Sequence, residues 1–423
     1  MSPLPRHLLP DSATIAGGRL SVGGVDVLDL VEELGTPMFV YDETHLRERC
    51  RQAVAAFGEG ATYGSKAFLC KAMARLAHEE GMRIDVATGG ELHVALAADV
   101  PADRLVLHGN NKSEAELGMA MAVGIGRIVV DSDEELGRIE RLVASEGFTP
   151  PKVLVRVTPG VEAHTHEYVM TGQEDTKFGF SLASGAAARA VDRAARSTAM
   201  DLVGIHSHIG SNIFLLSGYE KAVERLAPLV VPLDLPELCL GGGLGVAYVE
   251  GEETPSIDEW AGLLRRACSA AGISSGIVVE PGRAIVAAAA VTLYRVGTIK
   301  DLPGIRTYVA VDGGMSDNPR PVLYGSGYEA FLPRATDADR PWAVTIVGKH
   351  CESGDVLVRD ARLPADLAVG DVLATPVTGA YGHSMASNYN KVPRPPVVFV
   401  SDGEYRVVVR REALDDLLWL DLD

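Results

Sequence analysis

The stretch "ATYGSKAF", residues 61–68, begins as a short apolar run and places a lysine, Lys66, where the run ends. Seven similar runs follow it, separated by longer Ala-rich amphipathic stretches. The eight runs are "ATYGS" (61–65), "RIDVAT" (83–88), "RLVLHG" (104–109), "RIVVDS" (127–132), "KVLVRVT" (152–158), "LVGIHSH" (202–208), "LCLGGG" (238–243) and "GIVVEPG" (276–282). This alternation is typical of βα units around a parallel sheet. Eight units predict an α/β fold with a closed, TIM-like (β/α)8 barrel.

The pattern changes after residue 287. Apolar runs such as "AVTLYRVGTI", "TYVAVDGG" and "PVVFVS" follow one another with turns and few helical stretches between them, which predicts a second, mainly antiparallel β domain. The N-terminal piece "GGRLSVGGVDVLDL" also has strand character. We therefore expect the barrel at residues 36–286 and the β domain at residues 1–35 plus 287–423.

Charge and composition restrict the partners. A formal net charge of −18 would repel nucleic acid or an anionic membrane, so we expect a small-molecule substrate. The N-terminus lacks the features of a secretory signal, and no apolar stretch reaches the ~18 residues that span a bilayer, so we expect a cytoplasmic protein. The five cysteines show no CxxC spacing, which indicates neither a disulfide framework nor a zinc site.

The residues at the strand ends carry the chemistry. In a (β/α)8 barrel, the loops that follow the strands build the face where reactive groups gather. The residues found there are Lys66, Asp85, His108, Arg156, His206, His208, Gly241, Gly242, Gly243, Glu280 and Arg283. Together they predict one pocket.

The glycines of "GGGLG" (241–245) let backbone N–H groups approach an anion, and the loops after strands seven and eight commonly bind phosphate in this fold. A plain turn is the alternative. A lysine facing a phosphate-bearing ligand suggests pyridoxal 5′-phosphate, whose aldehyde reacts with an amine. Glu280 would then keep the pyridine nitrogen protonated, unless it is only an N-cap or a surface acid.

His208 lies two residues after His206, so both point to one side of a continuing strand. They suggest either a metal pair or a ring stacked on the cofactor. We favour stacking by His208 and a structural role for His206, because a metal needs ligands from further strand ends. A second HxH, "HTH" at 164–166, lies in a predicted loop.

Ten motifs in order give the chain a family resemblance. They are "YGSKAF", "DVATGGEL", "HGNNKS", "DTKFGF", "HSHIGS", "GGGLGV", "EPGRAIV", "VDGGMSDNPRPVLYG", "KHCESGD" and "GAYGHSMASNYN". From about residue 35 to 412 the chain resembles bacterial diaminopimelate decarboxylases, of the alanine racemase-like group of pyridoxal-phosphate enzymes. The resemblance implies a homodimer with active sites at its interface, which converts meso-diaminopimelate to L-lysine and CO2.

The resemblance also implies roles for single residues. Lys66 would be the Schiff-base lysine, His208 the residue stacked on the ring, and Glu280 the partner of the pyridine nitrogen. The rest of the cofactor site would comprise Asp85, Ser211, Gly242, Gly243, Gly282, Arg283 and Tyr381. Arg283 and Arg320 resemble carboxylate-binding arginines, and Tyr324 and Tyr381 would close the substrate site. Glu352, expected from the partner subunit, would bind the distal ammonium, and Cys351 beside it would protonate the carbanion.

One departure is Asn212, which stands where glutamine often follows "HIGS". The nearest rival function is decarboxylation of another basic amino acid, of the ornithine or arginine type, but such substrates lack the distal carboxylate that the paired arginines would bind. An alanine-type racemase needs no clamp made by Arg320 and Glu352. A non-catalytic cofactor-binding homologue should have lost Lys66 or Cys351. A metal-dependent barrel hydrolase is the remaining alternative.

Overall fold

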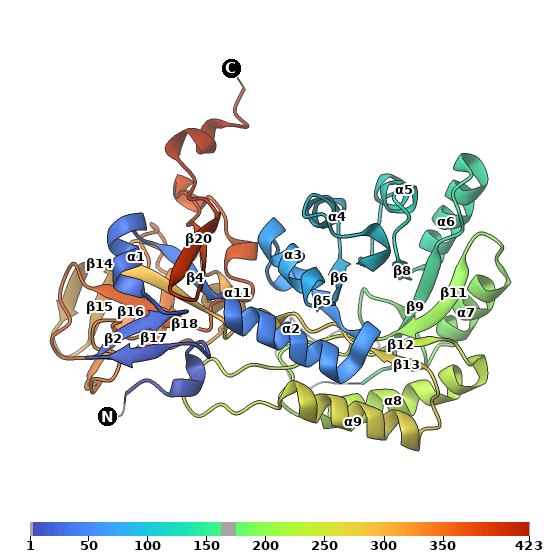
Figure 1. Ribbon diagram of the computed structural model, residues 1–423, viewed down its shortest axis with the longest axis horizontal. Helices are drawn as coiled ribbons and strands as arrows, with labels where there is room; N and C mark the ends of the chain where they lie inside the picture. The colour runs from blue at the N-terminus through green and yellow to red at the C-terminus, as the bar shows by residue number, and fades with distance from the viewer. Residues whose placement is uncertain (1–2, 162–174, 423) are drawn as a thin grey trace. The chain divides into compact units, whose positions relative to one another are not determined.

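Two compact units make up the chain (Figure 1). The structure is a computed structural model that describes residues 3–161 and 175–422. One unit, the barrel unit, consists of Arg49–Gly245 and Thr254–Ala284, and the other, the β unit, of Met1–Glu48, Val246–Glu253 and Ile285–Asp423.

Eight parallel strands form the sheet of the barrel unit, as the sequence predicts. They are β5 (Thr62–Gly64), β6 (Arg83–Val86), β7 (Leu105–Leu107), β8 (Arg127–Val130), β9 (Lys152–Thr158), β11 (Asp201–His206), β12 (Glu237–Cys239) and β13 (Gly276–Val278), with β10 (Phe180–Ser181) added to β9. Val279 closes the barrel, because its carbonyl accepts from the Thr62 N–H and its own N–H donates to the Gly60 carbonyl, both at 2.9 Å.

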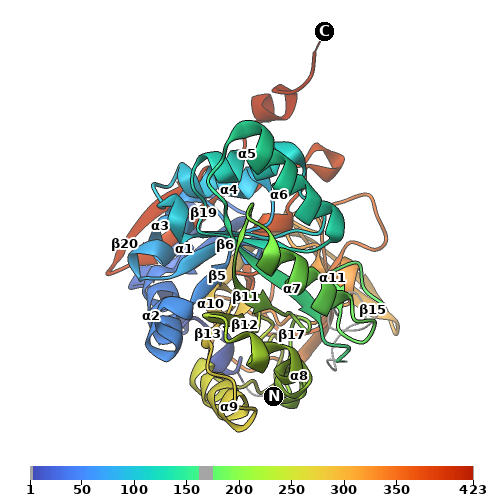
Figure 2. The ribbon, with the colours of Figure 1, turned by 90° about the vertical axis from the view of Figure 1, so that its right-hand side faces the viewer.

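Helices surround these strands (Figure 2). They are α3 (Lys71–Glu79), α4 (Gly89–Leu96), α5 (Glu114–Ala122), α6 (Asp133–Glu146), α7 (Ala186–Arg196), α8 (Ser217–Val230) and α9 (Ile257–Ala270); α2 (Glu43–Phe57) and α10 (Arg283–Val286) cross from one unit to the other. Ser132 caps the N-terminus of α6, since its hydroxyl accepts from the Glu135 N–H.

The barrel has a packed interior. Val106, Val129, Leu154, Cys239 and Val278, which come from five different strands, form one buried cluster. Apolar side chains of this size fill a barrel of eight strands, so the interior is a core and polar groups are left to its two ends.

A buried ion pair ties β8 to the start of α6. Lys112 Nζ donates to Glu135 at 2.6 Å, to the Val129 carbonyl at 2.6 Å and to the Gly109 carbonyl at 2.7 Å. Lys112 and Glu135 are both almost fully buried. The three acceptors satisfy all three donors of the ammonium group, which compensates for its desolvation.

The β unit contains an eight-stranded sheet with mostly antiparallel pairings. The strands are β4 (Met38–Asp42), β14 (Ala290–Leu302), β15 (Arg306–Val311), β16 (Trp342–Val347), β17 (Val356–Leu363), β18 (Val372–Pro376), β19 (Val397–Ser401) and β20 (Glu404–Val409), with helix α11 (Arg320–Tyr324) after β15. Strand β14 is long enough to pair with β4 and β18 in its first half and with β15 in its second half.

The N-terminal region differs from the prediction in two ways. Strand β4 falls in the range 36–286 expected for the barrel, yet it pairs with β14 and β19 of the β unit. All five of its residues are buried, so its apolar run looks like a barrel strand. In the piece 17–30, only β2 (Arg19–Val22) and β3 (Val25–Asp26) are strands, and they form a three-stranded sheet with β1 (Thr14–Ala16). The rest of the piece begins helix α1 (Val27–Leu34), whose N-cap is Asp26.

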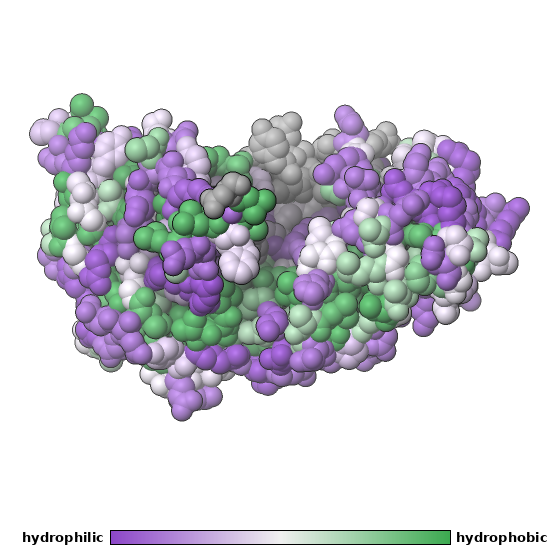
Figure 3. Space-filling view, turned by 90° about the horizontal axis from the view of Figure 1, so that it is seen from above, coloured by the Kyte–Doolittle hydropathy of each residue, from purple (hydrophilic) through white to green (hydrophobic). Residues whose placement is uncertain are grey.

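Hydrophilic side chains cover much of the face seen in Figure 3, in keeping with the charge of the chain. Within the described ranges, no helix combines the length and the apolar character needed to cross a bilayer.

We expect Lys112→Met to lower the free energy of unfolding by about 3–5 kcal/mol, because it leaves the Glu135 carboxylate buried without its partner. Chemical denaturation measures this loss. The double variant Lys112→Met/Glu135→Leu should recover most of it, since an apolar pair requires no charge to be buried. Equal stability of the single variant and the parent would contradict a stabilising role for the pair.

Candidate active site

The residues predicted to form the pocket meet at the carboxyl ends of the barrel strands. Lys66 is exposed and follows β5 in the short 3-10 helix Ser65–Ala67. Glu280 lies two residues beyond the last residue of β13. The loops that carry them are neighbours, because the Gly64 N–H donates to the Pro281 carbonyl at 3.0 Å. A side chain at Gly282 would clash, since its Cβ would lie 2.5 Å from the Gly64 carbonyl oxygen.

Two histidines from other strands flank the Glu280 carboxylate. Nε2 of His108, directly after β7, lies 3.0 Å from Oε1, and Nε2 of His206, the last residue of β11, lies 3.1 Å from Oε2. All three side chains are at most 10% exposed. The barrel therefore surrounds one carboxylate with two imidazoles.

The charges of the three groups are set by burial and by each other. Burial would raise the pKa of Glu280, but the electrostatic attraction of His108 and His206 and the hydrogen bond with His206 outweigh it and hold that pKa well below its usual range. Burial would lower the pKa of His108, but the attraction of Glu280 outweighs it and raises that pKa. For His206 burial wins and lowers the pKa to about 4. Near neutral pH, Glu280 is thus a carboxylate hydrogen-bonded by a neutral His206, and its charge makes His108 easier to protonate than a free histidine.

Asp85 of β6 belongs to the same electrostatic group. Burial raises its pKa to about 6, against the opposing charges of His108 and Lys66. The effect of Lys66 on this carboxyl places the amine within electrostatic reach of Asp85. Lys66 also helps to lower the pKa of His208.

The same cluster has the composition of a metal site. One ligand atom each from His108, His206 and Glu280 lie within 4.8 Å of one another. Both imidazoles, however, direct Nε2 at the carboxylate, and an imidazole must be neutral to bind a metal. We interpret the cluster as a device that keeps Glu280 charged.

His208 is held as a neutral ring. Its Nδ1 accepts a hydrogen bond from the Gly242 N–H at 3.2 Å, so this nitrogen carries no proton. Burial, reinforced by the charges of Lys66 and Arg156, holds the pKa of His208 well below its usual value. A neutral imidazole fixed by the glycine loop is suited to pack flat on an aromatic ligand.

The glycine loop packs so closely against neighbouring backbone that it has no room for side chains. Gly241 and Gly243 have φ of +68° and +107°. A Cβ on Gly242 would lie 2.1 Å from the Glu280 carbonyl oxygen, and one on Gly243 would lie 2.2 Å from the Gly210 carbonyl oxygen. The hydroxyl of Tyr219 donates to the Gly242 carbonyl at 2.8 Å and fixes the loop.

Further polar groups suit a phosphate-bearing cofactor. Arg283 Nη2 donates to the Ser211 hydroxyl at 3.0 Å, which joins the two residues beside the glycine loop. The buried hydroxyls of Ser65 and Ser207, next in sequence to Lys66 and His208, have no hydrogen-bond partner within the described part of the chain. With an amine, a carboxylate and a glycine cradle at one barrel mouth, these residues fit pyridoxal 5′-phosphate.

The other predicted site residues lie in the β unit. Arg320 is buried, with its guanidinium carbon 4.2 Å from the ring centre of Tyr248, and it donates to the Tyr328 hydroxyl at 2.6 Å. Tyr381, with φ of +58°, is among the groups whose electrostatic interaction raises the pKa of Arg320 against the effect of burial. Tyr324 is half-buried at the end of α11. Arg320 thus feels the electrostatic effect of Tyr381, and its direct contacts are with Tyr248 and Tyr328.

Cys351 and Glu352 are exposed in the loop between β16 and β17. The Cys351 N–H donates to Asn390 Oδ1 at 3.2 Å, and the Tyr389 hydroxyl donates to Glu352 at 2.7 Å. The motif "HTH" at 164–166 lies outside the described residues.

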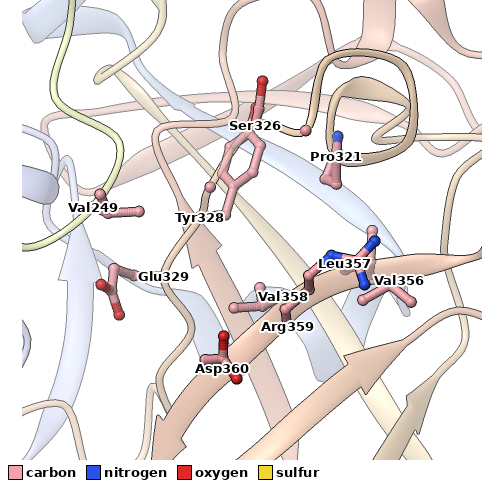
Figure 4. Close-up of a pocket in the computed structure, with 12 residues that line it drawn as sticks. Val249, Pro321, Ser326, Tyr328, Glu329, Val356, Leu357, Val358, Arg359 and Asp360 are labelled. Carbon is pink, nitrogen blue, oxygen red and sulfur yellow. The ribbon is translucent and has the colours of Figure 1, made fainter.

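A separate pocket of about 350 Å³ opens in the β unit beside Tyr328, Pro321 and Arg359 (Figure 4). It contains none of the side chains that the sequence singled out for catalysis or binding. Pro321 follows Arg320, so the pocket lies close to the predicted substrate arginine along the chain.

Sequence reasoning assigned no cofactor role to His108 and only a structural role to His206, yet both contact Glu280. Their positions at strand ends were the available signal, but nothing local shows that two strands direct their histidines at a third. Tyr389 and Asn390 were missed because their partners lie almost 40 residues away.

Comparison with known proteins identifies the class. The profile described as "Pyridoxal-dependent decarboxylase, pyridoxal binding domain" matches residues 43–287. The fold and the site thus define a pyridoxal-dependent decarboxylase.

Relatives over the full length narrow the assignment. The chain is 47% identical to diaminopimelate decarboxylase from Mycobacterium tuberculosis over 99% of this chain and 97% of the relative. It is 46% identical to the enzyme of that name from Bacillus subtilis, over 96% and 95% of the two chains. The solved diaminopimelate decarboxylase from M. jannaschii, in complex with L-lysine, matches with a TM-score of 0.91 at 32% identity and covers 98% of both chains. The chain belongs to the diaminopimelate decarboxylase family.

We expect Glu280→Gln to lower the pKa of His108, because the substitution removes the negative charge that raises it while burial remains. The stability that this pair contributes is fully present below the ordinary histidine pKa and is lost as the pH rises through the raised value, so the variant should also lose this pH dependence. Histidine NMR titration and denaturation at several pH values measure the two effects. As a control, Glu237→Gln removes a carboxylate that pairs with Arg83 and Arg127. An unchanged His108 titration in Glu280→Gln would contradict the assigned charges.

Proposed function

We propose that this chain catalyses the pyridoxal-phosphate-dependent decarboxylation of meso-2,6-diaminopimelate to L-lysine and CO2. The observation that carries the proposal is the buried Glu280, held ionised by His108 and His206 beside the strand end that bears Lys66. Membership of the diaminopimelate decarboxylase family supports the choice of substrate.

In this proposal mainly barrel residues would hold the cofactor. The Lys66 amine would anchor the aldehyde, and the Glu280 carboxylate would accept a hydrogen bond from the protonated ring nitrogen. The neutral His208 ring would pack on the cofactor face. The phosphate would lie against the glycine loop, Ser211 and Arg283. Asp85 and Gly282 of the barrel unit and Tyr381 of the β unit would complete the site.

The bound cofactor supplies an electron sink for the bond that breaks when CO2 leaves. The protein has to keep that sink strong. Glu280 does so because it stays anionic, and a carboxylate has lone pairs enough to accept from two histidines and one further donor. The negative charge of Glu280 raises the pKa of His108 and so favours its protonated form. Asp85, with a pKa of about 6, is the buried carboxyl of this group most easily protonated.

Substrate selection falls to the β unit. The Arg320 guanidinium is buried against two tyrosine rings, and its planar fork suits a carboxylate. An arginine preorganised in this way matches the second carboxylate of diaminopimelate, which ornithine, arginine and lysine do not have. Arg283, Tyr324 and Tyr381 would complete the substrate site.

We further propose a homodimer with shared active sites. Cys351 and Glu352 stand exposed on a loop, where each could reach the site of a second copy of the chain. Glu352 would bind the distal ammonium of the substrate, and Cys351 would protonate the carbon that has lost CO2. The proposal includes the predicted division into a barrel and a β domain, except that β4 belongs to the β domain, and a cytoplasmic location.

The test of this function is CO2 release from meso-diaminopimelate beside ornithine, arginine and lysine, each with and without added pyridoxal phosphate. We expect turnover of diaminopimelate alone, dependent on the cofactor. Preferred turnover of ornithine or arginine would favour the rival decarboxylase, and absence of turnover would favour a non-catalytic homologue.

We expect Lys66→Ala to abolish turnover and the covalent link to the cofactor, because alanine has no amine to react with the aldehyde. The fold should stay intact. Mass spectrometry after borohydride reduction reports the link, and circular dichroism reports the fold. Lys71→Ala, which removes an exposed lysine five residues away, is the matched control. Full activity of Lys66→Ala would refute the assignment.

We expect Arg320→Ala to weaken productive binding of diaminopimelate by about 2–4 kcal/mol, since it leaves a buried carboxylate without its partner. The loss should appear in kcat/KM. Arg359→Ala, an exposed arginine of the same unit, should leave kcat/KM unchanged. If Arg320→Ala behaves like this control, Arg320 does not bind the substrate.

A further inference from the structure

A network of hydrogen bonds holds the backbone of the loop that carries Cys351 and Glu352. At its base, Asp355 accepts from the His350 N–H at 2.9 Å and from the Met315 N–H at 2.7 Å. His350 Nε2 lies 2.9 Å from the Ser316 hydroxyl. The start of the loop is therefore fixed to the segment that follows β15.

Asn390 holds the loop nearer its exposed end. Its Oδ1 accepts from the Cys351 N–H at 3.2 Å and lies 3.3 Å from His350 Nδ1. Because an amide oxygen has two lone pairs and no proton, one atom can accept from both groups. His350 Nδ1 then carries the proton, and Nε2 can accept from the hydroxyl of Ser316.

The backbone at Asn390 explains why this residue type suits the position. Asn390 has φ of +52° in the turn Tyr389–Lys391. Asparagine tolerates this left-handed region better than most residues, and its short side chain places the amide oxygen close to the backbone. Glutamine has one more methylene group, so its amide oxygen would not lie at the same point beside the Cys351 N–H if the backbone were unchanged.

Tyr389 acts on the next residue of the loop. Its hydroxyl donates to Glu352 Oε2 at 2.7 Å, and its ring lies 5.5 Å from the His350 ring. Cys351 and Glu352 are exposed, so packing does not fix their side chains. Tyr389 instead holds the Glu352 carboxylate, and Asn390 holds the backbone of Cys351.

We propose that Asn390 and Tyr389 are positioning residues for the decarboxylation, of which Asn390 sets the backbone of Cys351 and Tyr389 orients the carboxylate of Glu352. This inference rests on the proposed function, in which Cys351 is the proton donor and Glu352 binds the distal ammonium. The two contacts should affect different kinetic constants. Loss of the Asn390 contact should mainly lower kcat, and loss of the Tyr389 contact should mainly raise KM.

The main experiment compares Asn390→Gly with Asn390→Asp in the full-length enzyme loaded with cofactor. Glycine accepts φ of +52° without strain, so Asn390→Gly removes the acceptor alone. We expect kcat for diaminopimelate to fall about 10- to 100-fold, the loss typical of a misplaced reacting group. Asn390→Asp, which keeps the acceptor oxygens, should retain most of kcat. Asn388→Ala is the control, because the Asn388 amide bonds to Val392 and Glu412 instead.

A double-mutant cycle separates positioning from general stability. Asn390→Gly should add no further loss of kcat in a Cys351→Ala background, because the group that it positions is gone. A purely structural role would lower kcat by the same factor in both backgrounds and would also lower the melting temperature and the cofactor absorbance. Tyr389→Phe should raise KM for diaminopimelate in the parent but leave it unchanged in Glu352→Gln.

Two failures are distinguishable. If the parent enzyme does not turn over diaminopimelate, the proposed function fails. If the parent turns it over but Asn390→Gly keeps the parent kcat, or lowers it equally in the Cys351→Ala background, the positioning role is overturned.

Discussion

The negative charge of Glu280, buried at the barrel mouth, is the constraint on which the site depends. An isolated carboxylate in this position would take up a proton, because burial disfavours the ionised form. Electrostatic attraction by His108 and His206, with the hydrogen bond of His206, reverses that preference. The three residues follow three different strands, so only the closed barrel brings them together. The ionised state of Glu280 therefore depends on the closure of the barrel.

The two units contribute different kinds of group. The barrel unit provides groups with strongly shifted pKa values in a rigid ring of strands, which suits the tuning of a cofactor. The β unit provides Arg320 among tyrosine rings and an exposed loop tied down by Asp355 and Asn390. In the proposed function, the β-unit residues select the substrate and the barrel residues hold the cofactor.

Much of the fold was readable from the sequence because period and composition are local signals. The eight barrel runs were found, and strand ends such as Lys66 and Glu280 pointed to one face. The membership of β4 was not readable, since five buried residues in a row carry no information about their partner. The sequence also does not predict two contacts, those of His206 with Glu280 and of Asn390 with the Cys351 N–H. Each joins residues that lie far apart along the chain.

The pairing of β4 has a consequence for how the chain is made. This strand leaves the ribosome early, yet its neighbours β14 and β19 are translated only after the entire barrel sequence. Until then this mainly apolar strand has open edges on which another nascent chain could add a strand. The barrel strands are all translated before the C-terminal sheet is complete, so this sheet forms last. Until it forms, β4 is unpaired and is the N-terminal segment most exposed to aggregation.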